Sequence, residues 1–192
     1  MADNLAYQCE YEEEYRSEML DGVIVLMAPR PATNHNRIVR NITYVFETYL
    51  RRKNCEMFTD GVDVFLTKKD RVIPDMMVVC DKNKIQSDGI HGAPDLIVEV
   101  LSPRTRKRDI GYKKDLYERC GVQEYWLVDP ENKTVVVYLL KDGKFVLDEV
   151  YEVIPDYIRF EPGEKEQCKT SIPVSLYDDF FVSLEDIFYN VL

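Results

Sequence analysis

The chain contains many short apolar runs separated by turn residues. It also contains two longer stretches in which apolar residues recur at helical spacing. The first two short runs, at 16–20 and 23–27, flank Asp21-Gly22, a strong type I′ turn pair, and predict a β-hairpin. Residues 33–52 follow the helical spacing, which predicts a helix capped by Thr33 or Asn34. The chain therefore opens with a hairpin and then a helix.

Further apolar runs predict strands at 56–66, 73–80 and 96–101, followed by a helix at 105–120 that ends at Gly121. Additional strands are expected at 124–128, 134–140 and 144–153, and Ser183 is typical of a helix start. This order predicts an α/β (α+β) fold with a mixed β-sheet flanked by helices. With 192 residues and no internal repeat, we expect a single domain over residues 1–192.

Carboxylates interrupt two of the apolar runs, and a buried carboxylate is costly without a compensating cation. Asp95 and Glu99 share one strand face but lie about 13 Å apart, too far for one metal ion. Asp75, on a strand about 5 Å away, is free to lie opposite Glu99. The spacing favours Asp75 with Glu99 as a metal-binding pair. Backbone capping at a strand entrance stays open for Asp75 and is favoured for Asp95.

The second predicted helix carries a lysine on its apolar side. At about 100° per residue, Lys113 falls near the middle of the apolar sector and Lys114 near its edge; the sector is formed by Ile110, Leu116, Tyr117 and Cys120. Lys113 either extends its amine to the surface as a structural residue or points at the carboxylates of the sheet. There it could position a water molecule or stabilise a developing negative charge.

His35, near the start of the first predicted helix, has two open interpretations. Capping or packing at the helix start is the favoured role, and a contact to phosphate or metal is the alternative. The five cysteines are odd in number, and no two are spaced as Cys-x-x-Cys. They are therefore predicted to be reduced packing residues, with neither a disulfide framework nor a zinc site.

The formal net charge of −10 argues against a nucleic-acid partner, because phosphate binding depends on Lys and Arg. The distribution weakens that objection. Residues 148–192 hold eleven acidic and three basic residues and form an acidic C-terminal extension, whereas residues 104–115 carry a net charge of +4. No apolar stretch is long enough to span a bilayer and no signal-peptide core is present, so we expect a soluble cytoplasmic protein.

A Pro-Asp pair followed 24 positions later by a glutamate resembles the PD-(D/E)XK nuclease superfamily. Over about residues 11–140, the ordered motifs are similar to the Uma-type restriction endonuclease family. These motifs are Asp21-Gly22, Asn34-His35, Pro74-Asp75, Pro94-Asp95, Glu99-Val100-Leu101-Ser102-Pro103, Asp109-Ile110-Gly111-Tyr112-Lys113, Tyr117 and Gly121 to Trp126. The resemblance implies a restriction-endonuclease-like core, here with an N-terminal hairpin and extra C-terminal strands.

The resemblance also implies a chemistry, the metal-assisted hydrolysis of DNA phosphodiester bonds. Asp75, Glu99 and the backbone carbonyl of Val100 would hold Mg²⁺, with Mn²⁺ as a substitute. Leu101 stands where the superfamily usually has a lysine, so Lys113 would assist the nucleophilic water. Supporting roles are implied for His35, Asp95 and Asp109. The basic patch after the predicted glutamate strand supplies the residues expected to contact DNA, which are Arg104, Arg106, Lys107, Arg108 and Lys114.

Three classes of function remain open from the sequence. A DNA endonuclease is the leading hypothesis, and cutting both strands with one site per chain would favour a homodimer. A non-catalytic module that binds nucleic acid or protein on the same fold is the principal alternative. A hydrolase of smaller phosphoesters is the third, because the sequence shows no recognisable DNA-reading element.

Overall fold

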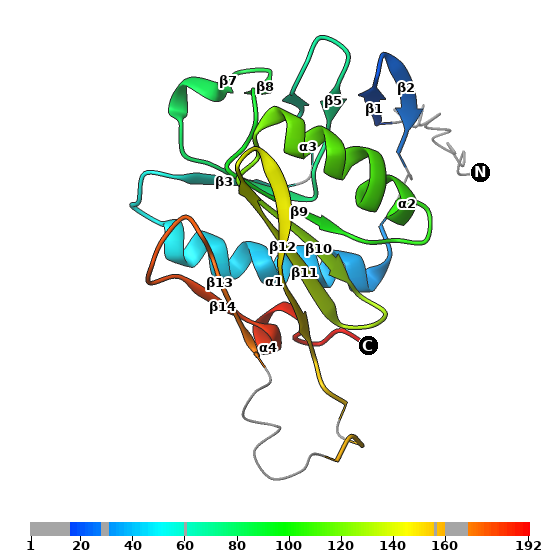
Figure 1. The fold of residues 1–192 in the computed structure, drawn as a ribbon, viewed down its shortest axis with the longest axis vertical. Helices are drawn as coiled ribbons and strands as arrows, with labels where there is room; N and C mark the ends of the chain where they lie inside the picture. Colours follow the sequence, from blue (N-terminus) through cyan, green and yellow to red (C-terminus); the bar gives the residue numbers. More distant parts are fainter. Residues whose placement is uncertain (1–15, 28–30, 60, 156, 160–168) are drawn as a thin grey trace, which may run out of the picture.

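The computed structural model of the protein describes residues 16–27, 31–59, 61–155, 157–159 and 169–192. In these ranges the chain forms two six-stranded β-sheets, a small two-stranded sheet and a few helices (Figure 1). The predicted mixed α+β class is confirmed. The strands divide between two sheets, and the predicted N-terminal hairpin belongs to the second.

The central sheet has the strand order β12-β11-β10-β9-β6-β3. β9 runs parallel to β10 and antiparallel to β6, so the sheet is mixed. Both faces of β6, β9 and β10 are buried, as their nearly continuous apolar runs indicate. The strands are β3 (Glu56–Thr59), β6 (Met76–Val79), β9 (Leu96–Val100), β10 (Glu124–Asp129), β11 (Thr134–Lys141) and β12 (Lys144–Glu152).

The second sheet contains the predicted N-terminal hairpin and has the order β2-β1-β5-β4-β8-β7. Asp21 and Gly22 both have positive φ angles, 49° and 79°, as the predicted type I′ turn requires. The strands are β1 (Ser17–Leu20), β2 (Val23–Leu26), β4 (Val64–Phe65), β5 (Arg71–Val72), β7 (Ile85–Gln86) and β8 (Gly89–His91). The sequence did not predict β5, β7 or β8.

Helices lie on both sides of the central sheet (Figure 1). On one side α1 (Thr33–Leu50) packs its buried residues against Leu96, Val98 and Val100 of β9. The C-terminal elements β13 (Ser171–Pro173), β14 (Phe181–Ser183) and α4 (Leu184–Ile187) join this layer. On the other side α3 (Lys114–Cys120) packs with Ile97 and Leu101. The predicted alternation of faces along β9 is therefore confirmed.

The helix predicted at 105–120 is not a uniform α-helix. It begins as α2 (Arg106–Arg108), continues as one π-helical turn, η2 (Asp109–Lys113), and ends as α3 at Gly121, whose φ of 90° confirms the predicted C-cap. A π turn holds more residues than an α turn, so the simple helical wheel shifts at this point. Ile110 is consequently 45% exposed, contrary to the predicted apolar sector, whereas Asp109 and Lys113 are buried.

Three local predictions need correction. The strand expected at 56–66 is divided between β3 in the central sheet and β4 in the second sheet. Similarly, β6 is shorter than the run at 73–80. α1 has Ala32 at its N-cap position without a side-chain cap, so neither Thr33 nor Asn34 caps it. At the other end of the chain Ser183 does cap α4, by accepting a hydrogen bond from the Asp186 N–H.

Cys55 and Cys80 form a disulfide, which contradicts the prediction of reduced cysteines. The two residues flank the register pair Glu56 and Val79 of the antiparallel strands β3 and β6. The sheet therefore brings them together although they lie 25 positions apart. Cys120 is half-buried and free, and the remaining cysteines, Cys9 and Cys168, lie outside the described residues. No helix in the described ranges is long and apolar enough to cross a membrane.

Candidate active site

Glu99 lies near the C-terminal end of β9, where its side chain points toward the helical side that carries α3. Only 4% of the residue is exposed. One carboxylate oxygen, Oε1, accepts hydrogen bonds from the Lys113 ammonium at 2.9 Å and from the Tyr117 hydroxyl at 2.7 Å. The carboxylate is therefore held in one orientation by two donors from a single helical segment.

Lys113 is the buried cation at the centre of this cluster. It is 3% exposed, which confirms the prediction that it points inward, and its catalytic role remains a prediction. Besides Glu99, the ammonium lies 2.7 Å from Glu18 Oε1 and 3.8 Å from Asp109 Oδ1. The π turn places Asp109 and Lys113 on the same inward side, one helical turn apart.

Asp75 immediately precedes β6 and lies beside the end of β9. The register pairs Met76 with Val98, so the next pair in the same register is Asp75 with Glu99. The Asp75 Oδ2 atom accepts a hydrogen bond from the Val100 N–H at 2.7 Å and contacts Nε2 of His35 at 3.1 Å. The structure thus brings Asp75 to the Glu99-Val100 peptide and places His35, from the start of α1, next to it.

Asp95 lies at the other end of β9, away from this cluster. Its Oδ2 atom accepts a hydrogen bond from the Cys80 N–H at 2.7 Å. Asp95 therefore satisfies backbone at the strand entrance, the role that the sequence favoured for it. The two Pro-Asp sequences are thus structurally different, since only Asp75 lies next to Glu99.

The buried cluster carries more acids than bases. Glu18, Glu99 and Asp109 face two cations, Arg108 and Lys113. Burial raises the pKa of Glu99 well above its ordinary value, and the Lys113 charge only partly opposes this. Burial likewise raises the pKa of Asp109, again opposed by Lys113. Burial alone would lower the pKa of Lys113, but the surrounding carboxylates raise it, so the amine stays protonated.

This donor set fits a hard divalent cation. The side chains supply oxygen atoms, the ligands that Mg²⁺ prefers, and Mg²⁺ is commonly held by only one or two carboxylates together with water. Asp109 Oδ1 is buried without a hydrogen-bond partner, and the excess of acids leaves negative charge to be neutralised. No three ligating side chains in the described part of the chain are already grouped around a common metal position.

Sequence reasoning missed Glu18 and did not foresee the contact of Tyr117. Glu18, in β1, is 1% exposed and contacts both Lys113 and Arg108. Its signal was present in the strand alternation, because Glu18 shares a face with the buried Leu20 in the predicted hairpin. Tyr117 was assigned to the apolar sector of the helix, but its hydroxyl donates to Glu99.

The residues predicted to contact DNA do not form one uniform basic surface. Arg106 pairs with Asp129 at 2.6 Å, and Arg108 pairs with the buried Glu18 at 3.1 Å. Lys114 lies over the ring of Tyr138, 4.6 Å from its centre. The exposed cations of the group are Arg104 and Lys107, which flank the start of α2.

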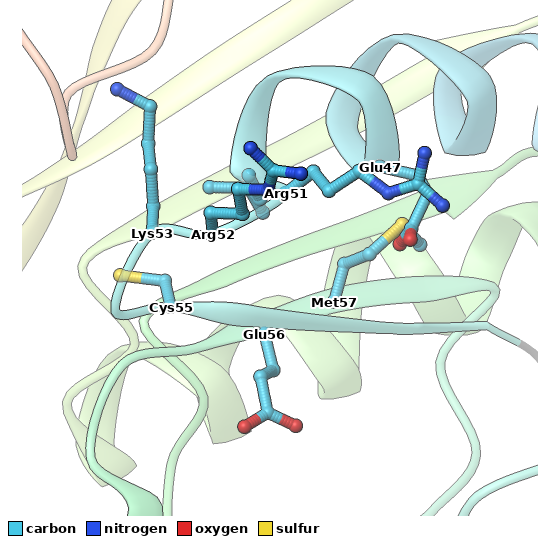
Figure 2. Close-up of a pocket in the computed structure, with 8 residues that line it drawn as sticks. Glu47, Arg51, Arg52, Lys53, Cys55, Glu56 and Met57 are labelled. Carbon is cyan, nitrogen blue, oxygen red and sulfur yellow. The ribbon is translucent and has the colours of Figure 1, made fainter.

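A separate pocket lies where α1 ends and β3 begins. Figure 2 shows three consecutive cations there, Arg51, Arg52 and Lys53, with the sulfur of Cys55 nearby. Glu47 and Glu56 also line the pocket, so its charges are mixed. None of the candidate active-site residues lines this pocket.

The fold has a solved counterpart. It matches the crystal structure of a protein from Anabaena variabilis, described as a putative nuclease belonging to DUF820, with a TM-score of 0.70. The match covers 93% of each chain at 22% sequence identity. The two proteins therefore share one mixed α+β architecture.

Sequence comparison identifies the family. The chain belongs to the Uma2 family, described as "Putative restriction endonuclease", whose model matches residues 3–173. The chain is also 29% identical over 137 residues to the uncharacterized protein slr1290 of Synechocystis sp.. That alignment covers 70% of this chain and 72% of the relative. The expected family is thus confirmed.

Proposed function

We propose that the protein is a Mg²⁺-dependent endonuclease that hydrolyses phosphodiester bonds in DNA. The observation that carries the proposal is the meeting of the buried Glu99 carboxylate and the half-buried Asp75 carboxylate at the end of β9. Glu99 is held there by Lys113 at 2.9 Å, and Asp75 is bonded to the neighbouring Val100 N–H at 2.7 Å. Membership of a restriction endonuclease family supports the same class of reaction.

Asp75 and Glu99, with the Val100 carbonyl, would hold the Mg²⁺ ion, and Mn²⁺ is the expected substitute. When bound, the metal would stabilise negative charge on the phosphate and lower the pKa of a water molecule. The protein's own contribution is to orient the oxygen donors. The Val100 N–H and His35 restrain Asp75, whereas Tyr117 and Lys113 restrain Glu99.

Lys113 would act as a fixed positive charge. Because the nearby carboxylates raise its pKa, the amine does not accept a proton from water at neutral pH. Its ammonium instead orients the Glu99 carboxylate and stabilises charge that develops on the phosphate oxygens. The residue thereby replaces the strand lysine whose usual position is occupied by Leu101.

DNA would approach the site from the loop that precedes α2. Arg104 in that loop and Lys107 in α2 are exposed, a few residues beyond Glu99 and on the same chain segment as Lys113. Phosphate contacts of this kind add affinity without sequence preference. Cutting of both strands would require a second active site, which a homodimer would provide.

A non-catalytic interaction module is the second candidate, and the net charge of −10 favours it because DNA binding is opposed by overall acidity. A cleavage assay separates the two. Purified protein is incubated with supercoiled plasmid, and in parallel with a small phosphodiester, in Mg²⁺, Mn²⁺ or EDTA. Metal-dependent plasmid cleavage that is lost in Asp75→Ala and Glu99→Ala supports the endonuclease.

Other outcomes of that assay reject the proposal. Salt-sensitive retention of DNA without cleavage in any metal would indicate the interaction module. Hydrolysis of the small phosphodiester alone would indicate a different substrate class. Cleavage that persists in both alanine variants would show that the assigned residues are not the active site.

A further inference from the structure

Glu18 links the N-terminal hairpin to the candidate active site. It lies in β1 with its side chain on the buried face, beside Leu20, and is 1% exposed. Burying a carboxylate at this depth is unfavourable unless its charge and its lone pairs are satisfied. The groups that satisfy the Glu18 carboxylate should therefore explain why the hairpin has an acidic residue at a buried position.

Three contacts from two other parts of the chain satisfy this carboxylate. Oε1 accepts a hydrogen bond from the Ile73 N–H at 3.1 Å and lies 2.7 Å from the Lys113 ammonium. Oε2 pairs with Arg108 at 3.1 Å. Ile73 leads through Pro74 directly into Asp75, so Glu18 contacts both the segment that carries Asp75 and the helix that carries Lys113.

The arrangement distinguishes Glu18 from a metal ligand. Both of its oxygens are already paired with cations of the protein, and the residue has almost no exposed surface. An ion pair that served stability alone could be replaced by apolar side chains at little cost. Here, however, the same ammonium spans Glu18 and Glu99, at 2.7 and 2.9 Å. Glu18 thus contacts the same ammonium as Glu99 and restrains its position relative to the Glu99 carboxylate.

We propose that Glu18 is a positioning residue, which fixes the Lys113 ammonium against Glu99 and, through Ile73, the segment that leads into Asp75. This inference rests on the proposed nuclease function and extends it, since it makes the hairpin β1–β2 part of the active site. Glu18 acts through Lys113 and Ile73 and need not touch the DNA or the metal.

Glu18→Gln tests the proposal because the amide oxygen can still accept from the Ile73 N–H, while the charge that holds Lys113 is lost. We expect kcat for plasmid cleavage to fall roughly 10- to 100-fold, as misplacement of a group at a reacting centre does. KM for DNA and the affinity for Mn²⁺ should change less than about threefold, because Glu18 contacts neither ligand. Asp21→Asn, an exposed charge removed from the same hairpin, is the matched control.

A second readout is independent of catalysis. The reactivity of each lysine toward an amine-acylating reagent can be measured by peptide mass spectrometry in the folded protein. Lys113 should be strongly protected in the wild type and in Asp21→Asn, and at least several-fold more reactive in Glu18→Gln. The exposed Lys141, which is remote from the hairpin, provides an internal reference. This measurement remains informative even if the protein proves to have no nuclease activity.

The outcomes of these measurements separate the positioning role of Glu18 from the proposed nuclease function. Unchanged Lys113 reactivity in folded Glu18→Gln overturns the positioning role, whether or not the wild type cleaves DNA. Wild-type kcat in that variant, or a large loss of Mn²⁺ affinity, also overturns it. Should Glu18→Gln not fold, Glu18→Asp keeps the charge but withdraws it by one methylene. That variant must then show raised Lys113 reactivity and reduced kcat, and failure of either rejects the proposal.

Discussion

The Asp75 carboxylate accepts a 2.7 Å hydrogen bond from the backbone N–H of Val100, the residue directly after Glu99. This contact fixes Asp75 beside the end of β9. Glu99, in contrast, is oriented by side chains of the helix, Lys113 and Tyr117. The two proposed metal ligands are therefore held by different parts of the fold, and their variants should behave differently.

Glu99→Gln should abolish cleavage and at the same time stabilise the protein at pH 8. Because burial raises the pKa of Glu99, its charged form is less favourable in the folded than in the unfolded state. Removal of the charge should therefore increase the free energy of unfolding at pH 8. For a protein of this size, each kcal/mol corresponds to about 2–4 °C in Tm.

The raised pKa of Glu99 also makes this difference in stability depend on pH. At a pH below the ordinary carboxyl pKa, Glu99 is protonated in both states, so the variant and the wild type should differ little. As pH rises through that value toward the raised pKa of Glu99, the wild type should lose stability relative to Glu99→Gln. Thermal unfolding from pH 4 to pH 8 measures this difference. A Tm of Glu99→Gln below that of the wild type at pH 8 would contradict the raised pKa of Glu99.

Lys113→Met should lower kcat by about 100-fold or more while Mn²⁺ still binds, because the ammonium stabilises charge and orients Glu99. The variant should also be destabilised by roughly 3 kcal/mol, since the carboxylates around Lys113, Glu99 among them, lose a buried counter-ion. Lys114→Met is the matched neighbour and should retain its turnover at saturating DNA. Equal turnover of Lys113→Met and the wild type would show that Lys113 has only a structural role.

Reduction of the Cys55–Cys80 disulfide should lower thermal stability. The bond closes a loop across 25 positions, and its removal is expected to cost about 3 kcal/mol, or roughly 6–12 °C in Tm. The Tm of the wild type should fall in dithiothreitol, whereas that of the double variant Cys55→Ser, Cys80→Ser should not respond. A Tm of the wild type that ignores the reductant would show that the disulfide contributes nothing.

Arg104→Ala combined with Lys107→Ala should weaken DNA binding and make it less sensitive to salt. Each lost phosphate contact lowers the slope of log K against log salt by about 0.9. Arg106→Ala is the informative comparison, because Arg106 pairs with Asp129 and its loss should affect this ion pair more than DNA. Binding titrations from 50 to 200 mM salt test this, and equal slopes for all proteins would exclude the loop as a DNA contact.

Local signals along the sequence were sufficient for much of the fold. Asp21-Gly22 specified a turn because few other residues accept its backbone angles, and Gly121 ended its helix for the same reason. The alternation of side chains placed Glu99 and Leu101 on one face of the predicted strand 96–101. Helical spacing placed Lys113 on the apolar side of its helix, although it wrongly placed Ile110 there too. These features depend on residues close together in the chain.

The remaining features depend on how distant segments meet. The Cys55–Cys80 bond follows from the β3–β6 register, which no spacing of cysteines reveals. The second sheet includes two-residue strands, β4 and β5, too short to give a periodic signal. Glu18 could be placed on a buried face, but its partners Lys113 and Arg108 lie about 90 positions away. A candidate site of this kind becomes complete only when the sheets are assembled.

The proposed active site depends most on the structural difference between Asp75 and Asp95. The direct test is the relaxation of supercoiled plasmid in Mn²⁺ by the wild type, Asp75→Asn and Asp95→Asn, all confirmed as folded. We predict that the wild type and Asp95→Asn cleave at similar rates, because the amide oxygen of Asn can still accept from the Cys80 N–H, and that Asp75→Asn does not cleave. Cleavage by Asp75→Asn at the wild-type rate would contradict the proposed active site.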